Sequence, residues 1–168
     1  MITEKEKEEL VTLIHEKYKA LDAPDFSFVR EVLANRPYAK VTQKIAQGFE
    51  LEEDTDPNDD VSFGYLLTKG HQRWMLRISM VGPYAVLFRL DSPEGIKVVS
   101  PGMPGLSAAE TSLVTLLSEA RIRLLDRDTL CLPVPIQLFN TEPENSRLYQ
   151  ALFVDSDVLP WETPFQQG

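Results

Sequence analysis

The sequence predicts an α+β fold in which an antiparallel β-meander of about five or six strands is covered on one face by helices. Residues 61–99 contain four short runs rich in aromatic and β-branched residues, separated by turn sequences that carry glycine and proline. Residues 3–21 and 107–125 place apolar side chains at helical spacing. A length of 168 residues fits one self-sufficient core, so we expect a single domain over residues 1–168.

The first predicted helix covers residues 3–21. Thr3 and Glu6 have the spacing of a capping box, in which each side chain satisfies a free backbone N–H of the other residue. Pro24 ends this helix, and Asp25 is expected to cap a second, short helix before Pro37. The chain therefore enters the fold through two helices.

The next segment, residues 38–51, has a mixed pattern, and we expect a strand in its second half. In the meander that follows, Trp74, Leu76 and Ile78 alternate with mostly polar neighbours. One sheet face should therefore lie in the core. The other face should be more polar and open to be covered.

After a glycine and proline connector, Ser107 and Glu110 repeat the capping-box spacing at the start of a helix with a broad apolar stripe. This helix and the first helix are expected to pack together on one face of the sheet. The segment "TLCLPVPIQLF" is expected to be extended and to lie at a sheet edge, because its two prolines cannot donate ladder hydrogen bonds. Apolar clusters up to Trp161 indicate that the tail packs back on the domain.

Charge restricts the classes of partner. The formal net charge is -9, and residues 50–60, "ELEEDTDPNDD", contain seven carboxylates and no base. Binding to nucleic acid or to anionic lipid requires a basic surface, so neither is expected. The N-terminus lacks the apolar core of a secretory signal, and no run is long enough to span a membrane, which favours a cytoplasmic protein.

The acidic run is the main candidate site. Three interpretations remain open: a solvated loop between two strands, a looser calcium or magnesium site, and a docking surface for a positively charged protein. An EF-hand loop is excluded, because Asp59 stands at its glycine position and Tyr65 at its bidentate glutamate position. The docking hypothesis rests on clustered charge, which accelerates association. It assigns partner binding to Glu52, Glu53, Asp54, Asp56, Asp59 and Asp60.

Other chemistry finds little support in the sequence. No nucleophile elbow or phosphate-binding glycine loop is present, and His15, His71 and Cys131 lie in separate segments. We therefore expect no enzyme, no catalytic residue, no metal ligand and no cofactor. Cys131 should be a buried small hydrophobe. Asp155 and Asp157 are interpreted as turn or capping residues rather than as an acid-base pair.

In its size, acidity, order of elements and carboxylate-rich loop, the chain resembles the bacterial immunity proteins that neutralise a cognate toxin. The resemblance implies tight one-to-one binding to a toxin or effector, often a basic nuclease whose phosphate-binding cleft an acidic surface can fill. One alternative is an acidic secretion chaperone that acts as a dimer. Another is a small-ligand-binding domain or an enzyme with an unrecognised site. The sequence leaves the oligomeric state open.

Overall fold

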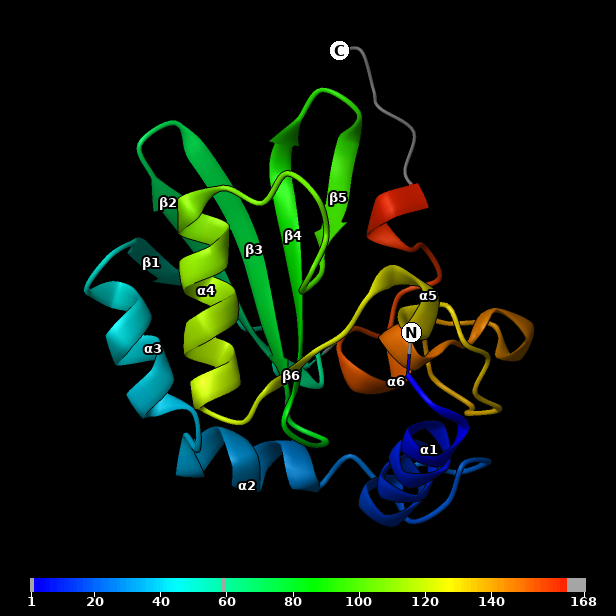
Figure 1. Cartoon of the computed structure of the whole chain (residues 1–168). Helices are drawn as coiled ribbons and strands as arrows, with labels where there is room; N and C mark the ends of the chain where they lie inside the picture. Colours follow the sequence, from blue (N-terminus) through cyan, green and yellow to red (C-terminus); the bar gives the residue numbers. More distant parts are fainter. Residues whose placement is uncertain (1, 59, 163–168) are drawn as a thin grey trace.

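The computed structural model describes residues 2–58 and 60–162, which form helices around one sheet (Figure 1). The α-helices are α1 (Glu4–Tyr18), α2 (Phe28–Asn35), α3 (Ala39–Ala46), α4 (Ala108–Glu119), α5 (Arg127–Leu130) and α6 (Leu148–Leu152). The strands are β1 (Glu50–Glu53), β2 (Ser62–Lys69), β3 (Gln72–Ser79), β4 (Tyr84–Ser92), β5 (Gly95–Val99) and β6 (Arg123–Leu124). Two 3-10 turns, η1 (Pro143–Asn145) and η2 (Pro160–Glu162), lie near the C-terminus.

The sheet is a meander. Its strands run in the order β1-β2-β3-β4-β5 with every neighbour antiparallel, and the short β6 pairs with β4 in parallel. The predicted α+β class and the predicted meander are both confirmed. None of the helices in the described ranges combines the length and the apolar character that crossing a membrane requires.

One face of the sheet is buried under α3 and α4 (Figure 1). The register places Leu67, Trp74 and Arg89 side by side on this face, and Tyr65, Leu76 and Leu87 in the next row. Trp74 is fully buried, as its phase in the strand predicted. Phe49, in the turn after α3, meets its indole edge to face, with ring centroids 5.6 Å apart.

The opposite face is covered in part by the C-terminal segment. The hydroxyl groups of Ser62 and Ser79, a register pair, donate hydrogen bonds to the carbonyl oxygens of Phe153 (2.8 Å) and Leu152 (2.6 Å). Further along this face, the Trp161 ring stacks on Phe88, with centroids 6.1 Å apart. The predicted return of the tail onto the domain is confirmed for the residues up to 162.

Several local predictions need correction. The strand expected in the second half of residues 38–51 is wrong for residues 45–49. Val41 and Ile45 lie one helical turn apart, are both buried, and belong to α3; pairing starts only at Glu50. Asp25 does not cap the second helix, because its carboxylate accepts from the N–H of Ser27, one residue before α2.

Two further segments differ from expectation. Of the segment predicted to be extended at a sheet edge, residues 129–130 belong to α5, since Asp126 accepts from the N–H of Thr129 and caps a helical turn. The rest of that segment joins no described strand of the sheet, and Pro133 forms an isolated bridge with Arg147 instead. The helix α1 lies at one end of the sheet rather than beside α4 (Figure 1). Its last residue, Tyr18, is buried and donates a hydrogen bond to the carbonyl of Ala151 in α6 (2.6 Å).

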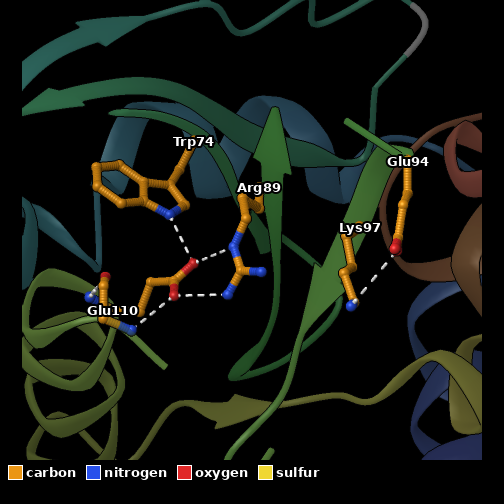
Figure 2. A network of polar contacts seen from close by, with 6 residues as sticks. Trp74, Arg89, Glu94, Lys97 and Glu110 are labelled. Atoms are coloured by element: carbon orange, nitrogen blue, oxygen red, sulfur yellow. Dashed lines mark hydrogen bonds and ion pairs between the residues drawn. The ribbon is translucent and has the colours of Figure 1, made fainter. Parts of the chain in front are cut away.

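A buried ionic network fastens α4 to the sheet (Figure 2). Glu110, in the first turn of α4 and only 1% exposed, accepts from Arg89 Nε and Nη2 (both 2.7 Å) and from the Trp74 indole N–H (3.0 Å). The backbone N–H of Ser107 also donates to this carboxylate, which completes the predicted capping box. Burial acts to raise the pKa of Glu110, but these four donors outweigh it and lower the pKa to about 2.

Leu117, on the buried face of α4, tests the layer order. It is fully buried, and we expect Leu117→Ala to lower the free energy of unfolding by about 2 to 5 kcal/mol, because it leaves a cavity between helix and sheet. The exposed neighbour Ser118 supplies the control, since Ser118→Ala should change stability by less than about 0.5 kcal/mol. Urea unfolding of both variants measures the difference, and equal losses would contradict the assignment of Leu117 to the core.

Glu110→Gln is expected to destabilise the protein by about 3 kcal/mol at neutral pH, because it leaves the Arg89 guanidinium without a counter-charge. The stability that ionised Glu110 supplies is fully present above its unfolded pKa of about 4.3 and is lost as the pH falls toward about 2. The difference in free energy of unfolding between wild type and variant should therefore become smaller over that pH interval. Glu94→Gln, which removes an exposed carboxylate 3.9 Å from Lys97, serves as control (Figure 2). A difference that stays constant down to about pH 2 would argue against the network.

Candidate functional site

The predicted acidic run divides into two structural parts. Glu50, Glu52 and Glu53 belong to β1, an edge strand, so the first part is not a loop. From Asp54 onward the chain leaves the sheet and folds over the end of β2. Asp59 lies outside the described residues.

The loop is held by its own carboxylates and by β2. The N–H of Asp54 donates to the carbonyl of Gly64 (2.7 Å), and the N–H of Gly64 donates to the hydroxyl of Thr55 (3.1 Å). Asp56 accepts from the N–H of Asn58, which closes an Asx turn at Pro57. A side chain at Gly64 would place Cβ 2.6 Å from the carbonyl oxygen of Asp54, so glycine is what lets the loop lie this close to the strand.

Asp60 is the most deeply buried of the run's carboxylates that the structure describes. It forms an ion pair with Arg77 on β3 (3.2 Å), and the side chains of Asp60 and Arg77 are only 8% and 16% exposed. Burial raises the pKa of Asp60 above its usual range, and the guanidinium offsets this only in part. Asp60 also forms an isolated antiparallel bridge with Val154, which connects the loop to the C-terminal segment.

A second acidic segment follows that bridge. Asp155 is buried and accepts hydrogen bonds from the backbone N–H groups of Phe139 and Asn140 and from the hydroxyl of Thr141. Asp157, which is exposed, accepts from the N–H of Glu142. Both carboxylates therefore hold the chain around residues 139–145. They stabilise turns, as expected, but in a segment that is distant in the sequence.

The two acidic segments surround one hollow of about 660 Å³. Its lining includes one cation, Arg77, and five carboxylates: Asp54, Asp56, Asp60, Asp155 and Asp157. Three predicted partner-binding residues therefore meet two aspartates that the sequence analysis had not assigned to the site. No local pattern indicated that this pair would join the acidic run, because the two segments meet through tertiary contacts. These are the bridge between Asp60 and Val154 and the hydrogen bonds that the N–H of Val61 and the hydroxyl of Ser62 donate to the carbonyl of Phe153.

Two other predicted site residues lie apart from the hollow. Glu53 forms an ion pair with Arg36, the residue after α2, and so connects the edge strand to the helices. Glu52 is exposed on β1. Neither lines the hollow.

Metal-binding chemistry finds no support in this part of the molecule. Within residues 2–58 and 60–162 there is no group of three or more histidine, cysteine, aspartate or glutamate side chains that could hold a metal ion. His15 and His71 are exposed. Cys131 is partly rather than fully buried, and burial raises the pKa of its thiol.

Clustered carboxylates around a concave surface concentrate negative potential, which attracts cationic groups. Comparison of the chain with protein-family models, with curated proteins and with solved structures gives no match. The site is therefore interpreted from its own geometry.

Asp60→Asn tests the burial of this carboxylate. A raised pKa in the folded state means that the wild type loses stability, relative to the amide, as the pH rises from the unfolded pKa of about 3.9 through the folded pKa. The stability of the variant relative to the wild type should therefore increase from about pH 4 toward neutrality, and thermal unfolding at several pH values measures this difference. Asp22→Asn, at an exposed position, is the control and should show no such trend. If the stability of the variant relative to the wild type instead decreased as the pH rises, the ion pair with Arg77 would outweigh the effect of burial on the pKa of Asp60.

Proposed function

We propose that this chain is a binding protein that engages a basic protein partner through the acidic hollow. The observation that carries the proposal is the convergence of Asp54, Asp56 and Asp60 with Asp155 and Asp157 around one concave surface. A solvated loop alone would give no reason for a second acidic segment to lie beside the first.

The charge balance of the hollow supports this proposal. Among the described residues that line it, the one cation is Arg77, which is already paired with Asp60. The donors that hold Asp155 are neutral N–H and O–H groups, so they satisfy its oxygen atoms without cancelling its charge. Incoming arginine and lysine side chains would supply the missing positive charge, with arginine able to bind a carboxylate through two parallel hydrogen bonds.

More specifically, we propose that the chain is a cytoplasmic inhibitor. The partner is then a toxin or effector whose basic, phosphate-binding cleft is covered one to one by the acidic hollow. Small size and local concentration of acidic charge support this form, because a carboxylate surface can occupy the place of a phosphate backbone.

The test replaces three carboxylates of the hollow by their amides, in the variant Asp54→Asn, Asp56→Asn, Asp157→Asn. All three residues are exposed, so the fold should be retained. Asp60 and Glu53 are left intact because they form ion pairs within the protein. The partner is captured from the producing cells, and its association rate with each variant is measured from about 20 to about 500 mM salt. We expect association about 10-fold slower at low salt, with the two rates converging at high salt.

The control variant Glu8→Gln, Glu16→Gln, Glu119→Gln removes the same charge from exposed positions on α1 and α4. It should retain most of the wild-type rate. Association rates that coincide for the wild type and the hollow variant at every salt concentration would reject the proposal. For the inhibitor form, one equivalent of the wild-type chain should abolish the activity of the captured partner.

A further inference from the structure

Beside the acidic hollow lies a second concavity, of about 420 Å³, in which six of the ten lining residues are apolar. We call it the Phe139 groove. Its apolar lining consists of Phe26, Val29, Leu33, Pro57, Val61 and Phe139. These residues come from α2 and the segment before it, from the acidic loop and from the segment after α5.

Phe139 is unusual for a large apolar residue because its side chain is 85% exposed. It is nevertheless held in place. Its ring packs against Phe26, with centroids 5.6 Å apart, and its backbone N–H donates to Asp155 (2.9 Å). An exposed aromatic ring on a fixed backbone is typical of the anchor residues that dominate protein interfaces.

The groove and the hollow are adjacent. Asp60 and Asp155 line both of them, so the apolar residues of the groove lie next to the carboxylate cluster. The groove lining also includes Arg30, an exposed residue of α2 that does not line the hollow. Arg30 therefore adds positive charge to the groove, whereas carboxylates outnumber cations in the lining of the hollow.

We infer that the Phe139 groove and the acidic hollow together bind a segment of the partner in which a large apolar or aromatic side chain is followed by arginine or lysine. This inference rests on the proposed function and specifies the chemistry of its partner. The apolar side chain fills the groove against Phe139, and the adjacent cations reach Asp54, Asp56 and Asp157. Because Arg30 lines the groove but not the hollow, it disfavours cations in the groove and so favours the basic side chains of the segment over the hollow.

Short fluorescent peptides provide the probe. The reference peptide carries one central phenylalanine followed by several arginines in a serine and glycine background. A second peptide replaces the phenylalanine by alanine, and a third replaces the arginines by glutamates. We expect the reference peptide to bind at least about 10-fold more tightly than the alanine peptide, and the glutamate peptide not to bind.

Protein variants assign this preference to the groove. Phe139→Ala should abolish the discrimination between the phenylalanine and alanine peptides, and Phe139→Leu should restore most of it. Val158→Ala is the matched control, because Val158 is also a large apolar residue at the surface, 59% exposed, but it does not line the groove. Melting temperatures of all variants verify that they are folded, as the exposure of both side chains leads us to expect.

Each opposite result overturns the inference. Equal affinity for the phenylalanine and alanine peptides would leave only charge recognition, so the proposed function would stand without the anchor. Discrimination retained by Phe139→Ala, or binding of the glutamate peptide, would place recognition elsewhere. Absence of binding by every peptide would reject a linear segment as the ligand, while the association rates of the hollow variant would still decide the proposed function. A wild-type dimer in sedimentation that Phe139→Ala dissociates would assign the groove to a second copy of the chain.

Discussion

The attachment of the C-terminal segment to the sheet is the interaction on which the candidate site depends. Ser62 and Ser79 have short side chains that bring their hydroxyl groups up to the carbonyl oxygens of Phe153 and Leu152 at the end of α6. These bonds satisfy buried polar groups that would otherwise cost free energy, so the segment has a defined position. Once Phe153 is fixed, Val154 pairs with Asp60, and Asp155 and Asp157 necessarily lie beside the acidic loop.

The two sheet faces differ in how their buried charges are compensated. On the face beneath α4, the carboxylate of Glu110 is enclosed by Arg89, Trp74 and Ser107, so the charges of Glu110 and Arg89 compensate each other. On the opposite face, Asp60 has Arg77, but the aspartates around the pair have no such counter-charge among the residues that line the hollow. Uncompensated charge at a concave surface is what a charged partner recognises.

The carboxylates of the acidic run have different structural roles. Glu53 connects β1 to Arg36, Asp56 closes a turn and Asp60 is buried in an ion pair. Solvation of a loop, the simplest interpretation, therefore describes only part of the run. Nearby lies the exposed ring of Phe139, which the pattern of charges in the sequence does not indicate. Its position is fixed by the hydrogen bond from its N–H to Asp155 and by the Phe26 ring.

The sequence by itself determined the features that depend on local physics. The meander, both capping boxes and the burial of Trp74 follow from alternation, turn residues and the reach of one side chain to a nearby N–H. Residues 39–46 escaped prediction because Val41 and Ile45 fit either a helix or a strand, and only packing against the sheet selects the helix. Only the tertiary structure decided the site. Asp155 and Phe139 join Asp60 through contacts between distant segments, and no local pattern encodes which distant segments will meet.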